Sequence, residues 1–184
     1  MDFQEIVEGV FTIEHFMTDE ECDEWIEFSE GEGYEEAKIS MGRNQVMNKS
    51  VRNNERLIYE SQDLANHLFE RIYPYIPHET AYGKVIGLNE RFRFYKYHVG
   101  QQFKPHIDGS FIRNIHEWSS YTFMVYLNED LKGGETRFPN ATIEPKKGKA
   151  LIFKHQLTHE GAPVFEGFKY VLRTDVMYRR KGKV

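Results

Sequence analysis

The chain has 184 residues and is mildly acidic, with 24 Lys and Arg against 29 Asp and Glu. This length suits one domain that buries roughly 70% of its unfolded surface, and the aromatic content of 15% favours strands over an all-helical bundle. The net charge of −5, without a long basic run, counts against a protein that binds duplex nucleic acid.

The cysteine content and the N-terminus bear on the cellular compartment. Cys22 is the single cysteine, so no disulfide can form within the chain, which suits a reducing environment. The first residues, MDFQEIVEGVF, contain acids and no basic segment, unlike a secretory signal. No apolar run approaches the ~20 residues that span a membrane. We expect a soluble, cytoplasmic protein that binds neither membrane nor nucleic acid; its oligomeric state stays open.

Two helices are predicted in the first half of the chain. Thr18 and Glu21 form a capping box that starts a helix, and Gly31 is expected to end it. A second helix is predicted over residues 61–73, where apolar side chains recur every four positions and a proline follows. The polar stretch 41–56 between them is predicted to form loop and short strand.

The second half of the chain has the pattern of β-strands. Aromatic and β-branched residues dominate four segments: RFRFYKYH (91–98), SYTFMVYL (120–127), KALIFK (149–154) and KYVLRTDVMY (169–178). In the first of them Phe92 and Phe94 face one way and the residues between them the other. Gly133 and Gly134 supply the positive φ that a tight reversal needs. Helices followed by closely spaced strands predict an α+β, mainly β fold with an antiparallel barrel or sandwich.

The stretch KPHIDGS (104–110) contains a candidate metal-binding pair. His106 and Asp108 are two residues apart, so in an extended chain both side chains point to the same face. An imidazole nitrogen and a carboxylate oxygen would then converge on one point. A metal ion needs at least one more ligand, which the rest of the chain has to supply.

Three histidines downstream can supply the missing ligand: His116, His155 and His159. The last two are four residues apart, the spacing of a zinc protease helix, but that motif needs a glutamate where Gln156 stands. The preceding LIFK is also typical of a strand. One histidine of this pair is therefore expected to bind metal while the other does not.

Five segments resemble a known family in their order and spacing: HID (106–108), GGETRFP (133–139), EPKKGKALIF (144–153), HEGAPV (159–164) and GFKYVLRTDVMYR (167–179). They are similar to the catalytic core of the prolyl 4-hydroxylase branch of the iron(II)- and 2-oxoglutarate-dependent dioxygenases. The resemblance covers residues 91–179, roughly half of the chain. It implies a double-stranded β-helix, a cupin-like jelly roll, supported by helices over about residues 1–90. The whole chain, 1–184, would then be one domain.

The resemblance also implies a set of iron ligands. In that family the histidine of the HEG-type segment is the distal ligand, so iron(II) would be held by His106, Asp108 and His159, which are also the catalytic residues. Such a triad leaves three adjacent positions open, two for the keto acid and one for O2. Asp108 favours hydroxylation, because related halogenases lack this carboxylate. Ascorbate is implied as a helper that rescues oxidised iron.

The distal carboxylate of 2-oxoglutarate needs a cation inside the barrel. The family pattern has a lysine ten residues after the distal histidine, which is Lys169 here. Arg173 shares its face of the strand and is a second candidate, since a planar guanidinium suits a carboxylate. Arg173 is equally able to pair with Asp175 or Glu135.

A tyrosine hydroxyl often completes the co-substrate site in this family. It lies nine residues before the first ligand, a position that Tyr97 occupies in this chain. Tyr126, on the next strand, is the weaker candidate.

The resemblance predicts an enzyme that hydroxylates an unactivated C–H bond and decarboxylates 2-oxoglutarate to succinate and CO2. A protein prolyl residue, a free amino acid and a small metabolite all stay open as substrates. Two other functions fit the same barrel: a module that binds 2-oxoglutarate or metal without turnover, and a cupin-type metalloenzyme that does not use 2-oxoglutarate. Succinate release would exclude the first, and full activity of a Lys169→Ala variant would support the second.

Overall fold

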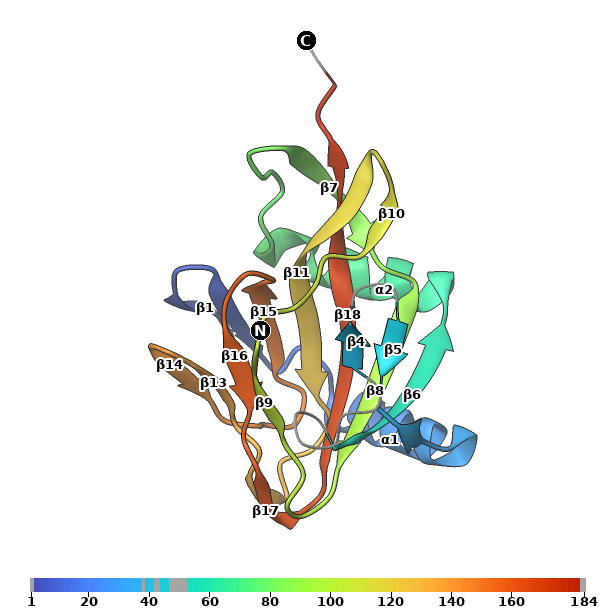
Figure 1. The fold of residues 1–184 in the computed structure, drawn as a ribbon, viewed down its shortest axis with the longest axis vertical. Coiled ribbons are helices and arrows are strands. Elements are labelled where there is room, and N and C mark those ends of the chain that lie inside the picture. Colours follow the sequence, from blue (N-terminus) through green and yellow to red (C-terminus); the bar gives the residue numbers. More distant parts are fainter. Residues whose placement is uncertain (1, 38, 42–43, 47–52, 183–184) are drawn as a thin grey trace.

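Ten strands of the described residues form one large antiparallel sheet in the computed structural model (Figure 1). The structure describes residues 2–37, 39–41, 44–46 and 53–182. Eight of these strands follow one another across the sheet in the order β1 (Asp2–Val7), β2 (Val10–Glu14), β15 (Ala150–Lys154), β11 (Glu117–Tyr126), β18 (Lys169–Arg180), β8 (Arg91–Tyr97), β6 (Glu55–Glu60) and β3 (Glu35–Glu36). The other two lie off this path: β10 (Ile112–Asn114) pairs with β11, and β7 (Gly83–Leu88) pairs with β18.

A smaller sheet packs against the large one. It has the order β14 (Ala141–Ile143), β13 (Thr136–Phe138), β16 (His159–Gly161) and β9 (Phe103–His106). Two separate two-stranded sheets are formed by β12 (Leu131–Gly133) with β17 (Val164–Gly167) and by β4 (Ile39–Met41) with β5 (Asn44–Val46). Tyr126 and Val171 of the large sheet share a buried cluster with Phe138 and Ile143 of the small one. Two antiparallel sheets packed in this way make a jelly roll, so the predicted mainly β fold is confirmed.

The helices cover the other face of the large sheet. They are α1 (Asp19–Glu32), α2 (Gln62–Ile72) and the short 3-10 helix η1 (Tyr73–Tyr75). Leu68 and Ile72 of α2 are buried in one cluster with Phe94 of β8. One face of the large sheet therefore packs against the helices, and the other face packs against the smaller sheet.

Both helices begin where the sequence predicts, the first of them at the predicted capping box. The Thr18 side chain accepts a hydrogen bond from the Glu21 backbone N at 3.1 Å, and the Glu21 side chain accepts one from the Thr18 backbone N at 2.8 Å. Ser61 caps α2 through the backbone N of Leu64. The expected end of α1 at Gly31 is wrong, because the helix continues to Gly33, whose φ of 88° ends it.

Replacing Thr18 with alanine is expected to lower the free energy of unfolding by about 1 kcal/mol. The variant loses the hydroxyl that accepts the Glu21 N–H, while the buried face of α1 is unchanged. Urea denaturation of both proteins measures the difference. Thr142, exposed on β14, is the matched position, where the same change should stay within about 0.5 kcal/mol. Equal effects at both positions would contradict a capping role.

The two faces of β8 point into the two cores, as its alternation predicts. Phe92 and Phe94 lie in the cluster under the helices, whereas Tyr95 and Tyr97 lie in the cluster between the sheets. β18 pairs with β8 so that Lys169 stands opposite Tyr97. Inward-facing side chains of both strands therefore line one space.

Residues 1–90, expected to be helical support, also contribute strands β1, β2, β3, β6 and β7 to the large sheet. Their partners are distant in the sequence: β2 pairs with β15, β6 with β8 and β7 with β18. Such pairing depends on contacts that a local pattern does not contain. Within the predicted loop over 41–56, β6 begins at Glu55, and residues 42–43 and 47–52 lie outside the described part of the chain.

The predicted reversal at Gly133 and Gly134 is confirmed, since their φ angles are 79° and 75°. A Cβ atom on Gly133 would lie 2.2 Å from the carbonyl oxygen of Pro163, so no larger residue fits there without movement. The reversal joins β12 to β13 and lies next to the side chain of Lys169.

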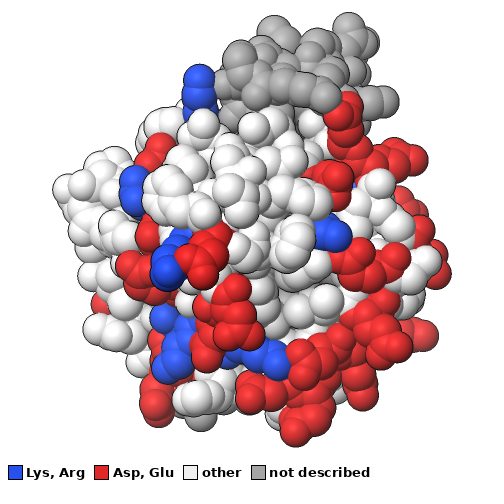
Figure 2. Space-filling view, turned by 90° about the horizontal axis from the view of Figure 1, so that it is seen from below, with Lys and Arg blue, Asp and Glu red and all other residues white. Residues whose placement is uncertain are grey.

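The surface is acidic over the part of the molecule that carries α1. Figure 2 shows Asp and Glu side chains gathered on the side where α1, with the sequence DEECDEWIEFSEGE, lies in Figure 1. This face repels polyanions. None of the helices in the described ranges is long and apolar enough to cross a membrane.

Candidate active site

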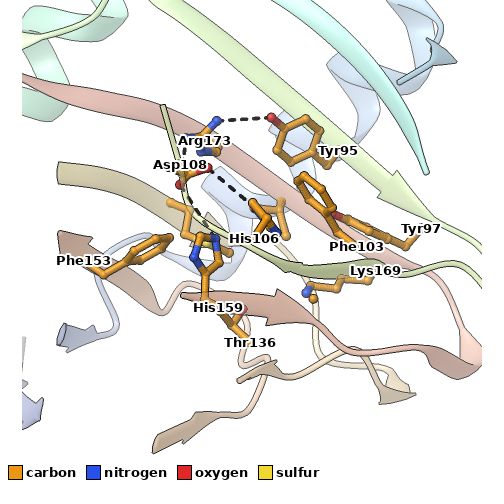
Figure 3. A pocket seen from close by; sticks show the side chains of 13 residues that line it. Tyr95, Tyr97, Phe103, His106, Asp108, Thr136, Phe153, His159, Lys169 and Arg173 are labelled. Carbon is orange, nitrogen blue, oxygen red and sulfur yellow. Dashed lines mark hydrogen bonds and ion pairs between the residues drawn. The ribbon is translucent and has the colours of Figure 1, made fainter. Parts of the chain in front are cut away.

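Three side chains with metal-binding atoms converge between the two sheets (Figure 3). His106 ends β9 and His159 begins β16, and the pairing of these strands places the two residues directly opposite each other. Asp108 follows β9 by two residues. The Nε2 atoms of His106 and His159 lie 3.8 Å from Asp108 Oδ1 and Oδ2, respectively, and one ligand atom from each of the three residues lies within 4.8 Å of the others.

Backbone carbonyl groups orient both imidazole rings. His106 Nδ1 lies 2.8 Å from the Lys104 carbonyl oxygen, and His159 Nδ1 lies 3.0 Å from that of Leu157. A carbonyl oxygen only accepts, so each Nδ1 carries the proton and each Nε2 presents its lone pair to the cluster. Burial lowers the pKa of His106 to about 4 and also lowers the pKa of His159, so both rings are neutral at neutral pH.

Asp108 is held as a charged carboxylate. Thr122 Oγ1 donates a hydrogen bond to Oδ2 at 2.5 Å, and Arg173 Nη2 lies 3.0 Å from the same oxygen. The Asp108 backbone N donates to the His155 carbonyl oxygen at 3.1 Å. Burial alone would raise the pKa of Asp108, but the Arg173 guanidinium, together with the Thr122 hydrogen bond and the two neighbouring histidines, outweighs it and holds that pKa below its usual range.

This donor set fits iron(II). Two neutral imidazoles and one carboxylate on one face form the facial triad typical of non-haem iron(II) oxygenases. Each ligand also has the outer hydrogen-bond partner that metal ligands normally have. The three residues face an open cavity, so positions opposite the triad are accessible to further ligands.

The cavity runs between the sheets from the triad toward Lys169. Its walls are mainly aromatic and apolar: Tyr95, Tyr97, Phe103, Met124, Phe153 and Val171 line it. Phe103 stacks on the His106 ring, with 3.5 Å between ring centroids and 16° between planes. Such walls exclude water from the reacting centre and fix one ligand ring by packing.

Lys169 lies at the far end of this cavity, at the start of β18. The residue is 3% exposed, and its Nζ lies 5.2 Å from the centroid of the Tyr97 ring and 5.4 Å from that of Tyr126. Burial lowers the pKa of Lys169 to about 7, and Glu135 opposes this shift in part. No carboxylate among the described residues forms an ion pair with Lys169. A buried cation of this kind is suited to an anionic ligand.

Arg173 lies at the metal end of the cavity instead. Its guanidinium contacts Asp108 at 3.0 Å and Asp175 at 3.3 Å. Asp175 was one of its two expected partners; the other, Glu135, pairs with Arg137 at 3.0 Å. The contact with Asp108 was not foreseen from the sequence.

The two candidate tyrosines have different surroundings. Tyr97 lines the cavity beside Lys169. Tyr126 is fully buried below Lys169, and its hydroxyl forms a hydrogen bond with Thr136 Oγ1 at 2.6 Å. Burial raises the pKa of Tyr126, so its hydroxyl stays protonated. Tyr126 therefore does not line the cavity, but it contacts Thr136, which does.

Several residues of the site were missed by sequence reasoning, above all Thr122 and Tyr95. Thr122 is linked onward to His155, whose Nδ1 lies 3.2 Å from Thr122 Oγ1 and whose Nε2 lies 2.9 Å from Ser119 Oγ. His155 thus braces the triad from outside and faces away from the metal position. The sequence signal that could have found Thr122 is a polar residue at an inward-facing position of an otherwise apolar strand.

Residues 92–174 match the model of the 2OG-Fe(II) oxygenase superfamily. Over this stretch, which is slightly less than half of its length, the chain is similar to this superfamily. The matched stretch contains the triad, Lys169 and Arg173. The match therefore covers the strands that carry the candidate metal-binding and co-substrate-binding residues.

The relatives support the prolyl 4-hydroxylase-like branch of the superfamily. "Probable prolyl 4-hydroxylase 11" of Arabidopsis thaliana is 32% identical over an alignment of 157 residues that covers 74% of this chain. The chain spans 49% of that relative's length.

Two solved structures share the fold. The viral collagen prolyl hydroxylase of Paramecium bursaria Chlorella virus-1, in a 2OG complex, has a TM-score of 0.65 at 22% identity and covers 91% of this chain and 95% of its own. A Trichoplax adhaerens prolyl hydroxylase, in complex with a hypoxia inducible factor peptide fragment, has a TM-score of 0.68 at 16% identity, with coverage of 94% and 83%.

Proposed function

We propose that the protein is an iron(II)- and 2-oxoglutarate-dependent dioxygenase of the prolyl 4-hydroxylase-like type, formed by one domain over residues 1–184. The observation that carries this proposal is one cavity, walled mainly by aromatic and apolar side chains, with a facial triad at one end and a buried lysine, without an ion-pair partner among the described residues, at the other. The balanced reaction takes 2-oxoglutarate, O2 and a C–H substrate to succinate, CO2 and the corresponding alcohol.

The residues divide the work between the two ends. His106, Asp108 and His159 would hold iron(II), which supplies the activation of O2 and the oxidation of the C–H bond. At the other end, the Lys169 ammonium would take the distal carboxylate of 2-oxoglutarate, with the Tyr97 hydroxyl beside it. The keto acid would thus be bound at both ends, and the aromatic walls would keep water from the centre.

We propose a peptidyl prolyl residue as the substrate. The named relatives are described as prolyl hydroxylases, and one of them was solved with a peptide fragment. Exposed aliphatic side chains flank Asp108 in the sequence, with Ile107 at 60% and Ile112 at 64% exposure. Exposed aliphatic side chains at this place would pack against an extended peptide.

The remaining conditions of the proposal are O2 as second co-substrate, ascorbate as a reductant that restores oxidised iron, and a cytoplasmic location. The buried and unpaired thiol of Cys22 fits a reducing compartment.

The test is turnover with candidate peptides. Iron(II), 2-oxoglutarate, O2 and a library of proline-containing peptides are supplied, and succinate and peptide oxidation are measured by mass spectrometry. We expect succinate in proportion to the oxidised peptide. Succinate coupled to no peptide but to a free amino acid would change the substrate class. Tight binding of 2-oxoglutarate without any succinate would instead establish the non-catalytic binding module.

The affinity for 2-oxoglutarate is expected to depend on pH through Lys169. Its pKa of about 7 means that the ammonium is lost as the pH rises above 7, and with it the partner of the distal carboxylate. Affinity should be nearly constant about one pH unit below 7, decline through pH 7, and approach a tenfold fall per pH unit about one unit above it. The three metal-binding side chains do not change charge in this range: burial lowers the pKa of both histidines, that of His106 to about 4, and the Asp108 carboxylate stays ionised.

Titration calorimetry across this range measures the slope, with 2-oxopentanoate as the control ligand. That acid has the same metal-binding end but no distal carboxylate, so its affinity should not change with pH. An equal slope for both acids would assign the titration to the metal end and contradict the role of Lys169.

A further inference from the structure

Arg173 is the one cation of the cavity lining that is already engaged with carboxylates. Its side chain is 14% exposed, and its Nη2 atom lies 3.0 Å from Asp108 Oδ2 and 3.3 Å from Asp175 Oδ1. The same nitrogen lies 3.2 Å from Thr122 Oγ1, and Nη1 lies 3.4 Å from the Tyr95 hydroxyl. The guanidinium of Arg173 is therefore already paired with two carboxylates, whereas Lys169 has no ion-pair partner among the described residues.

The contacts fall unequally on the two oxygens of Asp108. Each oxygen lies 3.8 Å from one imidazole, Oδ1 from His106 Nε2 and Oδ2 from His159 Nε2. Only Oδ2 also receives the Thr122 hydroxyl and the Arg173 guanidinium. A carboxylate oxygen that accepts two such contacts has less electron density left for a cation. Oδ1 is thus the oxygen that this arrangement presents to a metal ion.

Arg173 is itself fixed from behind. Asp175 is 2% exposed and is shared with Arg93, whose Nη1 lies 3.3 Å from Oδ2. Arg93, Arg173, Asp175 and the triad's own Asp108 thus form a group of two positive and two negative charges. Thr122 is fixed in turn by His155. The carboxylate of Asp108 rests on rigid neighbours and not on a mobile surface side chain.

We propose that Arg173 is a positioning residue that restricts Asp108 to one metal-binding oxygen and thereby keeps coordination positions open for the keto acid. A carboxylate that binds through both oxygens occupies two positions, whereas 2-oxoglutarate needs two and O2 one beside the triad. The inference rests on the proposed function for the identity of the incoming ligand. Its statement about Asp108 and the metal does not depend on turnover.

The test separates the two ends of the site with two ligands and two readouts. Arg173→Gln and Arg93→Gln are loaded with Co(II), whose visible spectrum reports coordination number, and then titrated with 2-oxoglutarate and with 2-oxopentanoate. Arg93 is the matched control, because it pairs with Asp175 as Arg173 does but is not a partner of Asp108.

In Arg173→Gln we expect a changed Co(II) spectrum and about tenfold or greater weakening of both keto acids, within the range that outer partners of metal ligands show. Arg93→Gln should keep the wild-type spectrum and affinities. Loss of 2-oxoglutarate binding alone, with 2-oxopentanoate unchanged, would make Arg173 an anchor of the distal carboxylate and overturn the inference. A wild-type spectrum with wild-type affinities in Arg173→Gln would overturn it as well.

Two further results keep the outcome clear. If Arg173→Gln does not fold, Arg173→Lys keeps the charge but loses the planar fork, and the same spectral change is expected from it. If the wild-type protein binds Co(II) but neither keto acid, the proposed function fails. The Co(II) spectra of the Arg173 variants then still decide whether Arg173 positions Asp108.

Discussion

Replacing His159 with alanine is expected to abolish tight iron(II) binding and all turnover that depends on it. The variant loses one of the three proposed ligands, whose Nε2 lies 3.8 Å from Asp108 Oδ2. The loss of iron affinity should exceed about 100-fold, the upper end of what outer partners of metal ligands typically cost. Iron binding is measured anaerobically by competition with a chelator, and turnover by succinate release.

His155→Gln is the matched control for this prediction. His155 is also a buried histidine and lies four residues away, but its ring nitrogens bond Ser119 and Thr122 and do not join the metal cluster. A glutamine can keep part of these hydrogen bonds, so iron affinity should fall by less than about tenfold. Equal losses in both variants would mean that His159 is not a direct ligand.

The Lys169→Ala variant is expected to bind 2-oxoglutarate about 100-fold more weakly, because removal of one partner of a buried charge pair costs several kcal/mol. Binding of 2-oxopentanoate should be unchanged, since that acid makes no use of the lysine. Folding should not suffer: burial lowers the pKa of Lys169, so its ammonium is unfavourable in the ligand-free protein.

Calorimetric titration of both acids and a thermal melt measure this set of effects. Lys154→Ala is the control, because Lys154 pairs with Glu8 at the surface, away from the cavity. A loss of less than tenfold for 2-oxoglutarate would contradict the anchoring role and favour the cupin-type enzyme that does not use this co-substrate.

Local sequence patterns predicted those parts of the fold that depend on local chemistry. The capping box at Thr18 set the start of α1, and the alternation of Phe92 and Phe94 with the tyrosines set the faces of β8. Strands such as β2 and β7 were not predicted, because they are stabilised by pairing with β15 and β18 near the other end of the chain.

The parts of the candidate site that follow from residue spacing or from the family resemblance were predictable from the sequence. Two-residue spacing places His106 and Asp108 together, and the family pattern selects His159 and Lys169. The approach of Arg173 to Asp108 was not predictable, since it brings a strand near the C-terminus against the residue that follows β9. Neither segment contains a local signal for the other.

The most direct test of the proposed site is an anaerobic titration of the metal-free protein, first with iron(II) and then with 2-oxoglutarate, followed in the visible range. A weak metal-to-ligand charge-transfer band that appears with the keto acid, and that is lost in His159→Ala, is the result expected from chelation at the triad. Tight iron binding without such a band would mean that the triad binds a metal but that the cavity does not hold 2-oxoglutarate on it.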